Sequence, residues 1–230
     1  DLFVDSDYSQ IELRLLAHIS GDEGLIEAFR ENQDIHRSTA SKVFGVAFDD
    51  VTDLQRRNAK AVNFGIMYGI SAFGLSQDLN IPQKEAQGFI DSYFATYPKI
   101  KEFLDQTVAQ AKECGFTRTL FGRIRPIPEL SSSNFMQRQF GERVAMNAPI
   151  QGTAADIIKI AMIRVHDRLI REGYKSRLIL QVHDELLIET AESEKDAVIA
   201  LLEEEMRQAA DLKVELAVGT ECGYNWYDAH

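Results

Sequence analysis

The chain has 230 residues, of which 45% are apolar and 27% charged, and its formal net charge is −11 at pH 7. This composition is typical of a folded globular protein and excludes disorder as the main state, and no apolar run approaches the roughly 20 residues that cross a bilayer. The two cysteines lie far apart without the spacing of a disulfide scaffold or a zinc site, which favours a reducing cytoplasmic setting.

The N-terminal half predicts one strand followed by helices. Alternation from Leu2 to Asp7 predicts a short strand, and Ser9 is placed to cap the helix that follows. Asp1 opens the chain without an initiator methionine or a signal peptide, so we expect a piece of a longer polypeptide. Periodicity, caps and breakers then predict helices over residues 22–32, 35–44, 52–68, 81–96 and 98–114.

The C-terminal half mixes helices with a hairpin. A short strand at 116–121 precedes a loop rich in Gly, Pro and Ser. Two helices are expected next, one stopping before Pro149 and one starting near Thr153. Residues 177–189 predict a tight hairpin that turns at His183-Asp184. The remaining predicted elements are a helix at 193–210 and a strand at 214–220.

This order of elements predicts an α+β fold. Strands at both ends of the chain with helices between them indicate one small antiparallel sheet carrying a large all-helical insertion. If the first strand lies beside the hairpin, Asp7 at its end comes close to Asp184 at the turn. Two neighbouring carboxylates repel each other and raise a pKa, a cost that divalent cations would relieve. Each aspartate alone is more often a simple cap or turn residue.

The charge is uneven along the chain, which matters for the choice of partner. Residues 54–68 carry three cations and no anion, residues 117–143 carry five arginines against two glutamates, and residues 184–215 carry eleven acids against three bases. A partner responds to the local field rather than to the sum. The acidic total therefore does not exclude nucleic acid.

A helix with cations and aromatics on one face stands out. Arg56, Lys60, Phe64 and Tyr68 recur every fourth residue, so they drift slowly around one side of the helix. The first half of that face offers charges for phosphates and the second half offers rings for a base or sugar. The alternative is a basic amphipathic helix with two core aromatics.

Three segments resemble the A, B and C motifs of family A DNA polymerases. They are Asp7-Tyr8-Ser9-Gln10-Ile11-Glu12-Leu13-Arg14, then Arg56 to Gly69 with Lys60 and Phe64, then Gln181-Val182-His183-Asp184-Glu185-Leu186. The resemblance spans essentially the whole chain. It implies a partial polymerase hand without a thumb, in which residues 1–12 belong to the palm, 13–140 to the fingers and 141–230 to the palm again.

The resemblance implies template-directed transfer of a nucleotide from a dNTP to a primer 3′-hydroxyl, with two Mg²⁺ ions as cofactors. It assigns catalysis to Asp7, Asp184 and Glu185, with Asp7, Asp184 and the Tyr8 carbonyl as metal ligands. Asp5 lies two residues before Asp7 on the same strand face. The family does not require a carboxylate there, so Asp5 is a secondary candidate.

The remaining site residues also follow from the resemblance. It assigns nucleotide binding to Gln10, Glu12, His36, Arg56, Lys60, Phe64 and Tyr68, and DNA binding to Arg143, Asn147, Gln151 and His183. Glu12 would block a ribose 2′-hydroxyl, although most glutamates are merely solvated. Arg143, Asn147 and Gln151 are spaced by four and suit minor-groove contacts that do not read sequence, but an exposed polar stripe has the same spacing.

The expected partners are primer-template DNA, dNTP and an upstream thumb and palm segment of the same polymerase, with no membrane. The expected location is the cytoplasm, in association with the nucleoid. Two alternatives stay open: a catalytically silent nucleotide- or DNA-binding fragment, and a relative of the phage-type RNA polymerases. Glu12 and Phe64 argue against the second.

Overall fold

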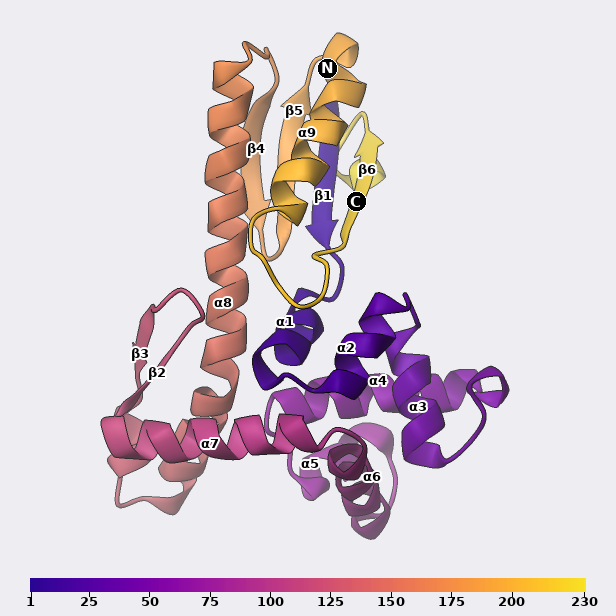
Figure 1. Cartoon of the computed structure of the whole chain (residues 1–230), viewed down its shortest axis with the longest axis vertical. Helices are drawn as coiled ribbons and strands as arrows, with labels where there is room; N and C mark the ends of the chain where they lie inside the picture. The colour runs from indigo at the N-terminus through magenta and orange to yellow at the C-terminus, as the bar shows by residue number, and fades with distance from the viewer. The chain divides into compact units, whose positions relative to one another are not determined.

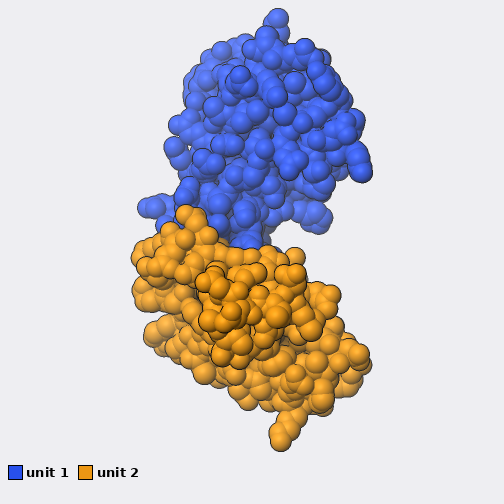
Figure 2. Space-filling model, turned by 90° about the vertical axis from the view of Figure 1, so that its right-hand side faces the viewer, with its two compact units in different colours: residues 1–15, 151–230 blue, residues 16–150 orange.

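The structure is a computed structural model that describes all residues, 1–230. It divides into two compact units, one formed by residues 1–15 and 151–230 and the other by residues 16–150 (Figure 2). The chain therefore passes between the units at 15/16 and 150/151, whereas the sequence placed these boundaries at 12/13 and 140/141. The first unit is called unit 1 below, and the second unit 2.

Unit 1 is built on a four-stranded antiparallel sheet (Figure 1). Its strands lie in the order β4-β5-β1-β6, so the N-terminal strand sits between two strands from the far end of the sequence. The strands are β1 (Leu2–Tyr8), β4 (Arg177–Val182), β5 (Glu185–Thr190) and β6 (Val218–Gly223). This sheet and the helices inserted after β1 confirm the α+β class.

Helix α9 (Lys195–Arg207) packs on one face of the sheet. The Tyr8 side chain points to this face, where its hydroxyl donates a hydrogen bond of 2.7 Å to the Met206 carbonyl. Because side chains alternate along a strand, Asp5 and Asp7 face the opposite side of the sheet. The short turn η4 (Tyr227–Ala229) packs against β1 and β6.

Unit 2 is helical apart from one small hairpin. Its helices are α2 (Glu23–Arg30), α3 (Ile35–Phe44), α4 (Asp53–Met67), α5 (Ala72–Leu79), α6 (Gln83–Thr96) and α7 (Pro98–Cys114), and the hairpin joins β2 (Phe116–Arg118) to β3 (Ile124–Pro126). The structure also has short 3-10 helices: η1 (Phe48–Asp50) and η2 (Pro128–Ser131) in unit 2, and η3 (Glu192–Glu194) in unit 1.

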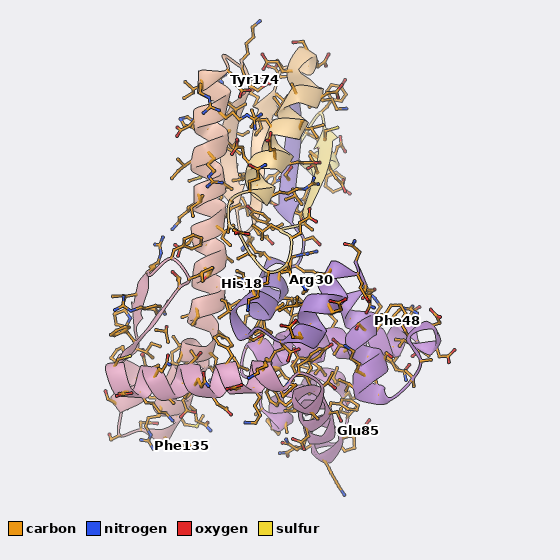
Figure 3. All side chains as sticks on the ribbon, in the orientation of Figure 1. His18, Arg30, Phe48, Glu85, Phe135 and Tyr174 are labelled. Carbon is orange, nitrogen blue, oxygen red and sulfur yellow. The ribbon has the colours of Figure 1, made fainter.

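Capping side chains set where the unit 2 helices begin. Thr52 forms a reciprocal capping box with Gln55, and Asp34 accepts two backbone N–H groups at the start of α3. The rings of Phe48 and Phe135 remain on the outside of the unit (Figure 3), and Phe135 is 60% exposed. None of the helices combines the length and apolar composition needed to span a bilayer.

Two helices begin in one unit and end in the other, α1 (Ile11–Ser20) and α8 (Phe135–Arg171). The predicted break before Pro149 is wrong, because α8 runs through the proline as one helix of 37 residues. A proline removes one helical donor and costs roughly 3 kcal/mol. Ala145 and Ile150 are fully buried on either side of it, so tertiary packing outweighs this cost.

Three further predictions need correction. Helix α5 was missed, although Ser71 caps it by accepting from the Gly74 amide. The residue before α1 is Gln10, whose carbonyl accepts the first helical bond, rather than the predicted cap Ser9. The last strand lies at Val218–Gly223 rather than 214–220, because β1 has already ended at Tyr8, which pairs with Val218.

The buried Tyr8 hydroxyl predicts a stability difference within unit 1. Tyr8→Phe removes one buried hydrogen bond to α9 and should lower the free energy of unfolding by about 1 kcal/mol. Urea unfolding followed by the fluorescence of the single tryptophan, Trp226, measures it. The control is Tyr227→Phe, at a side chain that is 90% exposed. If the two variants unfold at the same urea concentration, the hydrogen bond from Tyr8 to Met206 does not stabilise unit 1.

Candidate active site

Backbone pairing brings the predicted catalytic carboxylates together in unit 1. Asp7 pairs in register with Glu185 across β1 and β5, and the Tyr8 amide donates to the Asp184 carbonyl at 3.2 Å. Paired residues of two strands point to the same face. Residues that are 177 positions apart in the chain thus meet at one end of the sheet, as the sequence predicted.

The carboxylates at this end of the sheet, those of Asp5, Asp7, Asp184 and Glu185, repel one another. Partial burial raises the pKa of Asp7, and the negative charge of Asp184 adds to this increase. Burial likewise raises the pKa of Asp5 to about 6, with Glu185 as the next cause, and a hydrogen bond to His230 opposes the shift. Burial and mutual repulsion both disfavour the ionised forms. The group is therefore suited to hold positive charge.

A glycine on the neighbouring strand leaves room for Asp7. Gly219 is paired with Asp7 on β6, and a Cβ there would lie 2.9 Å from the Asp7 Oδ1. Any larger residue would have to move the carboxylate. Sequence reasoning missed Gly219, because only the register of β6 against β1 shows which residue faces Asp7.

Two predicted site residues, one just after β1 and one at the hairpin turn, have left-handed backbone conformations. Gln10 has a φ of 54° and His183 a φ of 51°, both in the left-handed region that few residues other than glycine adopt. His183 is exposed at the two-residue turn, and its carbonyl accepts a hydrogen bond from the Gln181 amide group. Glu12 is half-buried in the first turn of α1.

In unit 2, the predicted face of α4 is open to solvent. Lys60 is exposed, and Arg56, Phe64 and Tyr68 are partly exposed. The buried residues of α4 lie on other sides of the helix: Ala59, Val62, Asn63, Ile66 and Met67. The two rings are therefore only partly buried, and they lie in line with the cations rather than on the buried side of the helix.

The N-terminus of α3 holds Arg56 in place. The Arg56 Nε donates to Asp34 Oδ2 at 2.6 Å, while Asp34 Oδ1 accepts the backbone amides of His36 and Arg37. These bonds lower the pKa of Asp34 in spite of its partial burial. The sequence did not assign Asp34 a role in the site, although it lies only two residues before His36.

His36 is buried beside this pair and is held in one tautomer. The Thr39 hydroxyl donates to the Asn63 Oδ1 at 3.2 Å, which orients the amide so that its Nδ2 donates to His36 Nδ1 at 3.0 Å. The ring proton then lies on Nε2. Burial lowers the pKa of His36 to about 4, and the cations Arg56 and Lys60 lower it further against the opposing effect of Asp34.

A hollow of about 530 Å³ adjoins the aromatic half of the α4 face. Its lining includes Phe64, Tyr68 and Arg143, so the structure brings the first residue of the predicted DNA-binding stripe beside the two rings. Gly69 makes this approach possible: its φ is +70°, and a Cβ would lie 3.1 Å from the Arg143 side chain. No sequence pattern linked Gly69 to Arg143.

The other two residues of the stripe stay on α8. Asn147 is half-buried, its Oδ1 has no hydrogen-bond partner, and Gln151 is exposed. The four-residue spacing is kept because α8 is not interrupted at Pro149. Within each unit the structure thus groups the predicted residues: the carboxylates in unit 1, and the cations, His36, the rings and Arg143 in unit 2.

Comparison with known proteins decides the family. The family model described as DNA polymerase family A matches residues 1–228. The chain belongs to DNA polymerase family A. It is 56% identical over 227 residues to DNA polymerase I of Caldicellulosiruptor bescii and 53% identical over 228 residues to that of Geobacillus stearothermophilus, in each case over 99% of this chain.

A solved structure of the same family has the same fold. The polymerase domain of Pol1 from M. smegmatis, in complex with DNA primer-template and dNTP, superposes with a TM-score of 0.96 at 46% identity, covering 100% of this chain and 40% of that one. The chain spans about a quarter of the two curated relatives, 27% and 26% of their lengths. The resemblance seen in the three motifs is thus confirmed at the level of the family.

The buried neutral His36 predicts a pH-dependent stability of unit 2. Its folded pKa of about 4 lies below the ordinary value of 6.5, so the unfolded chain takes up the proton first as the pH falls. The neutral buried His36 therefore stabilises the folded unit fully above pH 6.5. As the pH falls from 6.5 to 4, the free energy of unfolding decreases by about 3 kcal/mol. Amide hydrogen exchange of α3 and α4 at pH 7 and pH 4 measures this loss.

The variant His36→Gln should remove that part of the pH dependence. The control is His166→Gln, at an exposed histidine of α8. If His36→Gln and the unchanged chain lose equal protection between the two pH values, the histidine is not buried in its neutral form.

Proposed function

We propose that the chain is the fingers and C-terminal palm of a DNA polymerase and carries out template-directed DNA synthesis. In the proposed reaction a primer 3′-hydroxyl attacks the α-phosphate of a dNTP and releases pyrophosphate. The observation that carries the proposal is the pairing of β1 with β5, which sets Asp7 beside Asp184. In this proposal unit 1 is the palm and unit 2 the fingers.

The donor set of unit 1 fits divalent cations, and family A membership supports their use. Asp7, Asp184 and the Tyr8 carbonyl supply only oxygen donors, which Mg²⁺ prefers. Burial and the charge of Asp184 raise the pKa of Asp7, and a bound cation would offset this cost. We propose two Mg²⁺ ions. When bound, they would activate the attacking hydroxyl and stabilise the leaving pyrophosphate. Glu185 stands next to this group as a further catalytic candidate.

The α4 face of unit 2 suits the nucleotide. Lys60 and the guanidinium of Arg56 supply charge for the phosphates, and the Asp34 bond to Nε leaves the other guanidinium nitrogens available. The neutral His36 can donate from Nε2. Phe64 is the proposed stacking partner of the sugar.

The remaining nucleotide contacts follow the family resemblance. Tyr68 would lie beside the templating base, and Gln10 and Glu12 would contact the incoming nucleotide, with Glu12 blocking a 2′-hydroxyl. Polar side chains of Arg143, Asn147 and Gln151 would contact the minor groove of the primer-template, where acceptors are nearly independent of sequence.

His183 would touch the primer end. The Pol1 domain of M. smegmatis, which superposes on the chain, is itself in complex with primer-template and dNTP. A further proposed partner is the upstream thumb and palm segment of the same polymerase. The proposed location is the cytoplasm, on the nucleoid.

The decisive experiment is single-nucleotide primer extension. The chain is assayed by itself and as a replacement for the matching segment of the C. bescii enzyme, to which it is 56% identical. We expect the chimaera to extend with dNTPs, and Asp184→Ala to reduce the rate by about a thousandfold or more through loss of charge stabilisation. An Asp184→Ala chimaera with normal rate would refute the catalytic assignment. An inactive chimaera that still binds dNTP would favour the silent binding module.

The α4 face predicts a separable effect on nucleotide use. Lys60→Ala in the chimaera should raise the dNTP concentration at half-maximal rate by roughly ten- to a hundredfold, the worth of one charged hydrogen bond. The matched control is Arg57→Ala, because Arg57 is exposed and lies about 100° around the helix from Arg56. Equal effects of the two variants would show a general loss of positive charge instead.

Gly219 predicts that added bulk disturbs the carboxylate. Gly219→Ala places a methyl group against Asp7 and should lower the extension rate at least about tenfold by misplacing it, while the chain stays folded. Gly88→Ala is the control, since a Cβ there meets nothing within 4 Å on helix α6. An unchanged rate for Gly219→Ala would mean that the sheet adjusts without moving Asp7.

A further inference from the structure

A second group of metal-binding side chains lies next to the proposed catalytic carboxylates, within unit 1. Asp5, Glu185 and His230 each place one ligand atom so that all three atoms lie within 4.8 Å of one another. Asp5 precedes Asp7 by two residues on the same face of β1. It is therefore displaced by about 6.7 Å along the strand from the group assigned to Mg²⁺.

The Asp5 carboxylate is incompletely satisfied. Asp5 is 5% exposed, and its Oδ1 has no hydrogen-bond partner. Glu185 is also buried, at 7% exposure, and its negative charge opposes that of Asp5. Buried charged groups are normally paired or bound to a metal. The Nδ1 atom of His230 is the neighbour that both carboxylates share.

The distances suit a common ion. The His230 Nδ1 lies 3.2 Å from Glu185 Oε2 and 3.5 Å from Asp5 Oδ2. Ligand atoms about 2.1 Å from a tetrahedral zinc ion lie about 3.4 Å apart. The imidazole of His230 is 67% exposed, so an ion can reach the group from solvent.

Packing of the last residues on the sheet places His230 beside Asp5 and Glu185. Gly223 is paired with Phe3, and a Cβ there would lie 2.6 Å from Asp228, so the glycine lets turn η4 pack on the sheet. The Asn225 Oδ1 accepts the Asp228 amide at 3.0 Å, and Ala229 is fully buried. The chain then ends beside β6 (Figure 1).

We propose that Asp5, Glu185 and His230 form a binding site for a divalent transition-metal ion such as Zn²⁺. The site does not use the proposed Mg²⁺ ligands Asp7 and Asp184, but it shares Glu185 with the proposed catalytic group. The mixed donor set gives the class of ion. One imidazole nitrogen with two carboxylates suits Zn²⁺, whereas Mg²⁺ favours oxygen donors alone.

The test is calorimetric titration of the full chain with ZnCl₂ in excess Mg²⁺. The background carries Asp7→Asn and Asp184→Asn, which removes the proposed catalytic ligands. We expect one Zn²⁺ per chain. Asp5→Asn and His230→Ala should each weaken its binding by about tenfold or more, since changes even outside the first ligands of a metal cost 10- to 100-fold.

Matched controls separate this site from general charge effects. Glu221→Gln removes a carboxylate that is paired with Asp5 on β6 but lies outside the group, and His166→Ala removes an exposed histidine of the same unit. Both should bind Zn²⁺ as the background does. His230→Ala changes an exposed terminal side chain, and circular dichroism checks that each variant is folded.

The proposal is overturned if the background chain binds no Zn²⁺. It is also overturned if Asp5→Asn and His230→Ala bind as tightly as Glu221→Gln and His166→Ala. In either case the three residues form only an ion pair in which a protonated His230 bridges two carboxylates.

Discussion

The proposed chemistry depends on two aspartates that repel each other and are held side by side by backbone hydrogen bonds. Asp7 ends β1, Asp184 turns the hairpin that begins β5, and the bond from the Tyr8 amide to the Asp184 carbonyl fixes their approach. The sheet itself does not need these carboxylates. The buried face against α9, where Tyr8 and the apolar residues of β1 pack, stabilises the sheet. Packing on the face against α9 thus holds the carboxylates of the opposite face close together.

In unit 2, helix α4 likewise has one side that stabilises the fold and another that carries the proposed nucleotide ligands. One side of the helix is buried through Ala59, Val62 and Ile66, and this side stabilises the unit. The other side keeps Lys60 and the rings accessible. Between the two, Asn63 reaches from the buried side to fix the His36 tautomer, and Asp34 holds Arg56. Arg56 and His36 are therefore oriented before any nucleotide is present, which lowers the entropy cost of binding.

Close approach at glycines shapes both units. Gly219 admits the Asp7 carboxylate, Gly223 admits the C-terminal turn, and Gly69 admits Met146 together with Arg143. At each position a side chain would meet its neighbour at a distance that real Cβ contacts avoid. These glycines do not contact the nucleotide in the proposed function. They determine which functional side chains can lie near one another.

The sequence by itself determined the family, the α+β class and most elements, because these depend on local signals. The cap at Thr52 and the stops at Gly45 and Gly115 fixed helix ends. The four-residue spacing from Arg56 to Tyr68 predicted that these side chains share one face of a helix, and in the structure this face is at least partly exposed. The two-residue turn at His183-Asp184 set the hairpin.

Tertiary structure alone decided what depends on contacts between distant segments. Pro149 stays helical because its neighbours are buried, and Val214 to Leu216 stay outside the sheet because β1 offers them no partner. The role of Gly219 and the meeting of Asp5 with His230 follow from strand register and from the packing of the last turn. Neither leaves a local pattern in the sequence, since the free energy that fixes them comes from residues far away along the chain.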